Sequence, residues 1–352
     1  MAKLAGTSAL TRIAGNLDCE LQVAMALSGR TEPDFFEALT GSEFLGEYGE
    51  RESARRRGRK FEENAYRYDA QPLKEALAAY IGVDVPDIVV RNVEDDAPGS
   101  RESSRVRRFT ITRNILRDLI AGASVPHIII QPQLVIPTGE PFKTRIFVAP
   151  DLLVLDTRRG IYEPGDLKSF VVRENSVASS DLERTRLQLG AAIIALRTEM
   201  MVQGRADIVG NHGLMIFATA FGLKPHPYKR EALDGAVTLI QRALEFMRLT
   251  ALKLEAMREP EQPLMHVLAP DLAINLQERC VSACVLAQYC RKRRPNTVRE
   301  LGDAAARMLG ADTDIDRLVA LMNGAAPASV SERAVAEMIH AGLARLGIQE
   351  VA

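Results

Sequence analysis

Tryptophan is absent from this 352-residue chain, and histidine, with five residues, and cysteine, with four, are scarce. The histidines are scattered, with no pair at ligand spacing, so they give no support for a histidine metal site. The few tyrosines and phenylalanines form no series on which successive bases would stack. No apolar run is long enough to cross a bilayer, and the N-terminus lacks the layout of a secretion signal. The sequence therefore predicts a cytoplasmic protein that does not enter a membrane.

An excess of positive charge is also missing, because the formal net charge is −1. The total therefore does not identify a nucleic-acid binder, but three local basic clusters stand out. The first, which we predict to bind DNA, comprises Arg55, Arg56, Arg57, Arg59 and Lys60, the second comprises Arg101, Arg105, Arg107, Arg108, Arg113 and Arg117, and the third comprises Arg291, Lys292, Arg293 and Arg294. Clustered cations neutralise backbone phosphates and release counterions. The alternative is that they are solvated helix faces.

The hydrophobic pattern changes several times between helical and extended periods. Helical spacing covers residues 8–30, 51–70, 72–81, 105–122, 181–202 and 230–257, and strand-like runs cover 125–136, 145–156, 161–170 and 214–221. A polar stretch at 94–104 predicts a loop. Strands among long helices predict an α/β fold with a sheet covered on its faces.

Four segments are expected along the chain. They are a helical N-terminal region at 1–124 with the first cysteine, a sheet-bearing core at 125–270, a cysteine segment at 271–296 and a helical tail at 297–352. In the tail, Ser329 and Glu332 form a capping box before an apolar helix face.

The most informative polar pattern is Pro150-Asp151 followed by Asp166-Leu167-Lys168. Because strand side chains alternate, Asp166 and Lys168 are expected on one face, and a hairpin would bring Asp151 beside them. Two such carboxylates suit Mg²⁺ or Mn²⁺. Such an ion polarises a phosphodiester and lowers the pKa of an attacking water. Lys168 would orient that water or stabilise the charge that builds on phosphorus.

Two further residues are weaker candidates for the same site. Glu62 lies on the expected helix 51–70 and has two interpretations: a further acid of the metal site, or a solvated helix residue. Gln188 lies on the expected helix 181–202 and also has two: a contact to substrate or metal-bound water, or an exposed glutamine without a role. The motif is short for a chain with 46 acidic residues, so the alternative for the whole pattern is surface carboxylates at strand ends.

The four cysteines have an uneven arrangement. Cys19 stands alone, and Cys280, Cys284 and Cys290 follow as C-x3-C-x5-C. Four is the number of ligands that a cubane iron–sulfur cluster requires, whereas zinc modules usually have short-spaced pairs such as C-x2-C. Buried thiols without a ligand are the alternative. The spacing favours iron–sulfur over zinc, and such a cluster would tie the N-terminal helices to the C-terminal segment.

Taken in order, these motifs resemble the iron–sulfur branch of the RecB-like PD-(D/E)xK nucleases, which includes the CRISPR-adaptation nucleases and the nuclease domain of AddB. The matching elements are Cys19, the helical motif Gly58 to Glu62, Asp151, Asp166 with Lys168, Gln188, and Cys280, Cys284 and Cys290. The chain departs from the family in its C-x3-C spacing, in Glu62 where histidine is frequent, and in Ala192 where a tyrosine is usual.

The resemblance implies a restriction-endonuclease-like mixed sheet flanked by helices, with helical N- and C-terminal additions and a four-cysteine cluster. By the same resemblance, Asp151 and Asp166 hold the catalytic metal, Lys168 assists the attacking water, and the four cysteines bind a 4Fe–4S cluster.

The leading hypothesis is a Mg²⁺- or Mn²⁺-dependent deoxyribonuclease, an exonuclease on single strands or DNA ends, in DNA repair, recombination or phage/CRISPR-type defence. Its tail from residue 297 would dock a helicase or another repair or defence protein. One alternative is a non-catalytic DNA-binding or scaffold subunit that keeps the nuclease fold. Another is a zinc-stabilised interaction protein.

Overall fold

The computed structural model describes residues 6–44, 52–138, 145–171, 179–219, 222–226, 228–257, 272–277, 280, 284–293, 298, 307, 310 and 313–345. The chain forms two compact units, unit 1 at Met1–Asn275 and unit 2 at Leu276–Ala352. Among the helices in these ranges, none is long and apolar enough to cross a membrane.

A six-stranded mixed sheet in the order β1-β2-β5-β6-β7-β8 forms the centre of unit 1. Its strands are β1 (Val90–Asn92), β2 (Ile128–Ile130), β5 (Leu152–Asp156), β6 (Ile161–Val171), β7 (His212–Ala218) and β8 (Lys229–Ala232). The pairs β1–β2 and β6–β7 are parallel, and the other neighbours are antiparallel. A separate antiparallel pair consists of β3 (Leu134–Pro137) and β4 (Arg145–Val148).

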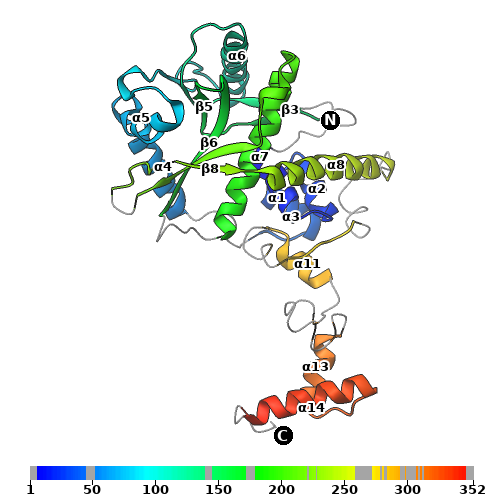
Figure 1. The fold of residues 1–352 in the computed structure, drawn as a ribbon. Helices are drawn as coiled ribbons and strands as arrows, with labels where there is room; N and C mark the ends of the chain where they lie inside the picture. Colours follow the sequence, from blue (N-terminus) through cyan, green and yellow to red (C-terminus); the bar gives the residue numbers. More distant parts are fainter. Residues whose placement is uncertain are drawn as a thin grey trace. The chain divides into compact units, whose positions relative to one another are not determined.

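Helices lie on both sides of this sheet (Figure 1), which confirms the predicted α/β class. They are α1 (Thr7–Gly15), α2 (Glu20–Leu27), α3 (Glu32–Thr40), α4 (Glu52–Ala65), α5 (Arg67–Ile81), α6 (Arg101–Ile120), α7 (Ser179–Val202) and α8 (Asp234–Ala256), with 3-10 turns η1 (Val85–Asp87) and η2 (Ala206–Ile208). Because β1 pairs with β2, the sheet draws on both of the segments 1–124 and 125–270 that were defined from the sequence.

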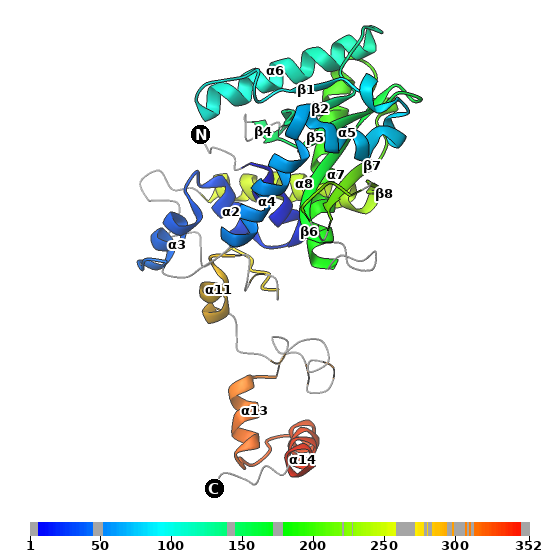
Figure 2. The same cartoon turned by 90° about the vertical axis from the view of Figure 1, so that its left-hand side faces the viewer.

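One face of the sheet packs against α4 and α5. Leu73 and Leu77 of α5 belong to the same buried cluster as Ile128, Val154 and Ile216 of the strands. The other face is covered by α7, which in turn contacts α1 and α8. Figure 2 shows α6 running past the end of the sheet at which β1 and β2 lie. The apolar burial on both faces explains why the central strands have almost continuous hydrophobic runs rather than a clean alternation.

Two of the strands expected from the sequence are each divided in the structure. The run 125–136 is divided at Gln131, whose φ of 52° is unusual for a residue with a side chain, so β2 and β3 belong to different sheets. The run 145–156 is divided around Pro150, which has no N–H for a ladder, into β4 and β5.

Other boundaries also differ from the expectation. The expected loop 94–104 ends earlier, because the Ser100 side chain caps α6 by accepting a hydrogen bond from the Ser103 N–H. Residues 230–232, expected to be helical, belong to β8. Residues 220 and 221 of the expected strand 214–221 lie outside the described residues.

In unit 2 the described helices are α11 (Ala287–Arg293), α13 (Ile315–Met322) and α14 (Val330–Arg345). A small core of Leu318, Leu321 and Ala336 joins α13 to α14, which lie next to each other in Figure 2. The predicted capping box is present in part. Ser329 Oγ accepts from the Glu332 N–H at 3.1 Å, while the Glu332 carboxylate accepts from the Ala328 N–H.

Candidate active site

The hairpin of β5 and β6 brings the predicted acids together. Leu152 pairs with Gly165, so the register places Asp151 opposite Asp166 just before β5 begins. Strand alternation puts Asp166 and Lys168 on the face opposite Leu167. Leu167 packs on the α4/α5 side, so Asp166 and Lys168 point toward the side of α7.

Direct contacts link the three charged side chains of this motif. Asp151 Oδ2 accepts a hydrogen bond from the Leu167 N–H at 2.7 Å, which fixes that carboxylate against β6. Lys168 Nζ lies 2.8 Å from Asp166 Oδ2. Asp166 is buried and Lys168 is mostly buried, so both charges are largely removed from water.

The electrostatics show two acids competing for one lysine. Burial raises the pKa of Asp151 well above its usual value, and the negative charge of Asp166 raises it further, while Lys168 and the Leu167 N–H act in the opposite direction. Burial lowers the pKa of Lys168, but Asp166 and Asp151 outweigh that effect and raise it. One ammonium group therefore does not fully compensate two neighbouring carboxylates.

Gln188 Oε1 is a buried oxygen atom with no hydrogen-bond partner among the described residues. Asp166 Oδ2 is also buried, and the Lys168 ammonium lies 2.8 Å from it. Buried acceptors without partners are costly. Two adjacent carboxylates are the hard oxygen ligands that Mg²⁺ or Mn²⁺ prefers, so the pair Asp151 and Asp166 fits such an ion.

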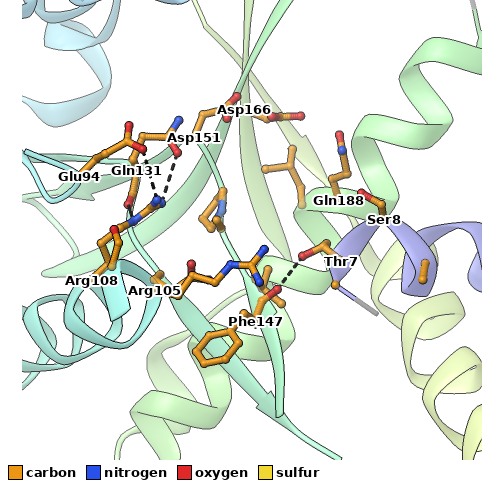
Figure 3. A pocket seen from close by; sticks show the side chains of 18 of the residues that line it. Thr7, Ser8, Glu94, Arg105, Arg108, Gln131, Phe147, Asp151, Asp166 and Gln188 are labelled. Atoms are coloured by element: carbon orange, nitrogen blue, oxygen red, sulfur yellow. Dashed lines mark hydrogen bonds and ion pairs between the residues drawn. The ribbon is translucent and has the colours of Figure 1, made fainter. Parts of the chain in front are cut away.

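Asp151, Asp166, Lys168 and Gln188 all line one cleft, with a volume of about 880 Å³. Figure 3 shows the acids on one side of the cleft and Gln188 and Ser8 next to each other on another. The start of α1 and one side of α6 complete the walls. Their lining residues, with those of the neighbouring strands and loops, include Thr7, Ser8, Arg12, Glu94, Arg105, Arg108, Gln131, Gln133 and Phe147.

Local contacts hold these walls in place. Thr7 Oγ1 donates to the Phe147 carbonyl at 3.0 Å and so joins the start of α1 to β4. Arg108 Nε donates to the Gln131 carbonyl at 3.0 Å, and the Gln131 N–H donates to the Asp151 carbonyl at 2.8 Å. A buried arginine on α6 thus supports the left-handed residue that positions the backbone of Asp151.

These wall residues were not predicted from the sequence to belong to the site. Arg105 and Arg108 lie in the second basic cluster, which was the available signal, but the face of α6 that meets the cleft depends on tertiary packing. The side chain of Arg101, from the same cluster, lies outside the described residues. No feature of the sequence indicated that Thr7 and Ser8 would lie beside β4 and α7.

Glu62 lies on α4 within electrostatic range of the motif. Burial raises its pKa, Lys168 lowers it, and Asp166 raises it. Tyr66, between α4 and α5, is also close, since burial and then the charges of Asp151 and Glu62 raise its pKa. The structure therefore places Glu62 near the carboxylate–lysine group, although it is not among the residues that line the cleft.

The first basic cluster does not contribute to the cleft lining. Arg55, Arg56, Arg57, Arg59 and Lys60 are exposed on α4, and none of them lines the cleft. Some of these cations have local partners, as in the ion pairs of Arg56 with Glu52 and Lys60 with Glu63 and the hydrogen bond from Arg57 to the Ser169 carbonyl. These contacts are typical of a solvated helix face, and DNA binding by this cluster stays a prediction.

All four cysteines are buried. Cys19 precedes α2, and the segment 273–275 packs on both sides of it: the Glu20 N–H donates to the Ala273 carbonyl at 2.9 Å, and Asn275 Nδ2 donates to the Leu17 carbonyl at 2.9 Å. In unit 2, the Cys284 N–H donates to the Cys280 carbonyl at 2.9 Å. Within the described part of the chain, no three His, Cys, Asp or Glu side chains form a ready metal-binding group.

Fold and site together define an α/β protein with a polar cleft lined by two adjacent carboxylates, a lysine paired with one of them, and a glutamine. Comparisons with known protein families, with curated proteins and with solved structures found no match. The chemistry of the cleft is therefore the basis on which a function can be proposed.

Proposed function

We propose that the protein is a Mg²⁺- or Mn²⁺-dependent deoxyribonuclease with a PD-(D/E)xK-type core. The observation that carries this proposal is the convergence of Asp151, Asp166 and Lys168 in one cleft. A structural ion pair would match one acid with one base, but here two buried acids share one lysine. Two buried carboxylates are unfavourable beside a single cation and favourable around an added divalent cation.

In this proposal Asp151 and Asp166 hold the cation, with Glu62 as a further acid at its edge. The bound ion would polarise the phosphodiester and lower the pKa of a water. Lys168, which stays protonated beside two carboxylates, stabilises negative charge that builds on the phosphoryl oxygens. Gln188 uses its free amide oxygen to orient the attacking water or the substrate.

The size of the cleft supports single strands or frayed DNA ends as the substrate. A volume of about 880 Å³ lies in the range, roughly 300–1,000 Å³, of pockets that enclose small ligands. Such a space accommodates a few nucleotides of one strand rather than an intact duplex. We propose DNA repair, recombination or phage defence as the setting, with the tail from residue 297 as the contact for a helicase or a related partner.

We also propose that Cys19, Cys280, Cys284 and Cys290 bind a 4Fe–4S cluster. Support comes from the burial of all four cysteines and from the clustering of Cys280, Cys284 and Cys290 within eleven residues of the sequence. Anaerobically purified protein should be brown and contain about four iron atoms per chain. Cys284→Ser should lose colour and iron. Colourless wild-type protein that contains zinc would refute the iron–sulfur proposal.

The nuclease proposal is tested by incubating the full chain with labelled single-stranded DNA, duplex DNA and RNA. We expect cleavage of the single-stranded DNA with Mg²⁺ or Mn²⁺, none with a chelator, and none in an Asp166→Ala variant. Binding of DNA without cleavage under any metal condition would refute the enzymatic proposal and favour the scaffold alternative.

A further inference from the structure

Three arginines line the cleft, and two of them have acidic partners. Arg12 forms an ion pair with Glu32, and Arg108 lies 3.7 Å from Glu94 while it also donates to Gln131. Lys168, the remaining cation of the lining, is paired with Asp166. These pairs neutralise most of the positive charge of the cleft.

Arg105 is different. Its side chain is only partly exposed, and it makes no hydrogen bond or ion pair with any residue in the described ranges. Figure 3 shows it extending from α6 into the cleft, toward Thr7 and Phe147. It is also close enough to Arg108 to disfavour that cation, whose pKa is lowered by burial and, to a smaller extent, by Arg105. A half-buried guanidinium beside a second one is unfavourable unless an anion lies between them.

We propose that Arg105 binds a backbone phosphate of the DNA strand next to the phosphate that is cut. This inference rests on the proposed function, and it adds the contact that holds the strand across the cleft from Asp151 and Asp166. A guanidinium suits this role because its planar donors match two phosphate oxygens at once. The inference also moves the main phosphate contact from the α4 cluster, which is absent from the cleft lining, to α6.

The test is a binding measurement that does not depend on cleavage. The full chain is titrated into a short fluorescein-labelled single-stranded oligodeoxynucleotide with a chelator present, and anisotropy is recorded at several salt concentrations. The variants are Arg105→Ala and Arg105→Lys, with Arg117→Ala as the matched control. Arg117 is an exposed arginine of the same helix that does not line the cleft, about 18 Å further along the helix axis.

Arg105→Ala should weaken binding about tenfold, the effect of losing one charged hydrogen-bonding contact. It should also lower the slope of log K against log salt by about 0.7, the value for one phosphate contact on a single strand. Arg105→Lys should keep the slope and recover part of the affinity, because lysine retains the charge but lacks the paired planar N–H donors of a guanidinium. Arg117→Ala should match the wild type in both quantities.

Equal affinity and slope for Arg105→Ala and Arg117→Ala would overturn the inference, and so would a loss of affinity in Arg105→Ala with an unchanged slope. Cleavage assayed separately with Mn²⁺ distinguishes the two proposals. If the wild type binds through Arg105 but never cuts, the nuclease proposal fails and the phosphate contact stands. If the wild type cuts and Arg105→Ala binds normally, only the phosphate contact fails. A wild type that binds no DNA refutes both.

Discussion

Two aspartates at opposite ends of β5 should respond in opposite ways to the same substitution. The Asp151 carboxylate neighbours Asp166, and its pKa is raised by burial and then by that negative charge. Asp156 is buried as well, but two arginines bind it. Burial alone would raise its pKa, but Arg159 and Arg158 outweigh that effect and lower it. In metal-free protein near pH 7, Asp151→Asn should therefore stabilise the fold and Asp156→Asn should destabilise it.

The expected magnitudes follow from the contacts. Repulsion between two neighbouring carboxylates is on the order of a few kcal/mol at an effective dielectric constant of about 20, and Lys168 offsets much of it, so Asp151→Asn should add about 1–2 kcal/mol to the free energy of unfolding. The new amide oxygen still accepts from the Leu167 N–H. Asp151→Ala leaves that donor without an acceptor and should be about 1–3 kcal/mol less stable than Asp151→Asn.

The pH dependence gives a second signature. A carboxylate whose pKa is raised in the folded state destabilises the fold when it is ionised, so the advantage of Asp151→Asn should shrink as the pH falls through the raised pKa. The lowered pKa of Asp156 contributes stability above the unfolded-state value, about 3.9, and that contribution is lost as the pH falls below it. The difference between wild type and Asp156→Asn should therefore shrink only at more acidic pH.

Urea unfolding of the wild type and the three variants, with a chelator and then with Mg²⁺, measures these effects. Mg²⁺ should stabilise the wild type by mass action and have little effect on Asp151→Asn. The reasoning fails if Asp151→Asn is less stable than the wild type without metal, or if Mg²⁺ stabilises both proteins equally.

Further predictions concern the packing around the cleft. A Cβ on Gly190 would lie 3.0 Å from the Ala236 carbonyl carbon. Gly190→Ala should therefore force α7 and α8 apart and lower the free energy of unfolding by about 1–3 kcal/mol. Gly58→Ala, in open space on α4, should instead raise it by about 0.5–1 kcal/mol. Equal effects in a denaturation series would contradict this account of helix packing. Arg113 Nε donates to the buried Glu199 carboxylate at 2.7 Å. Arg113→Met leaves that carboxylate without its cation and should lower the free energy of unfolding by about 2–3 kcal/mol, a value reduced because the arginine is partly exposed. An Arg113→Met variant as stable as the wild type would show that this pair does not hold α6 to α7.

The carboxylate–lysine geometry could be predicted from local pattern alone. Alternation along β6 placed Asp166 and Lys168 on one face, and the turn at 156–160 implied the hairpin that brings Asp151 to them. Short hairpins are local structures, so their register follows from turn length and alternation. The helix α3 was missed although its signals were present, since Thr31 caps it and Gly41 ends it in a left-handed conformation.

The rest of the site depends on tertiary packing that no local pattern encodes. Gln131 interrupts an apolar run with a left-handed backbone conformation, which a glutamine in the sequence does not predict. Arg108 of α6 holds that conformation through a hydrogen bond to the Gln131 carbonyl. The start of α1 reaches the cleft only because Thr7 binds the carbonyl of Phe147, 140 residues away in the sequence. The cations of α4 form a conspicuous basic run in the sequence, but they are not among the residues that line the cleft, and their predicted binding of DNA stays a prediction.

The central claim is that Lys168 acts with Asp151 and Asp166 on a phosphodiester, and single-turnover cleavage tests it most directly. Labelled single-stranded DNA is mixed with excess protein and Mn²⁺, using wild type, Lys168→Ala and the control Lys229→Ala, an exposed lysine at the start of β8. We expect Lys168→Ala to lose about a hundredfold or more in cleavage rate, with DNA binding within about twofold of wild type, and Lys229→Ala to cut normally. Cleavage by Lys168→Ala at the wild-type rate would contradict the account.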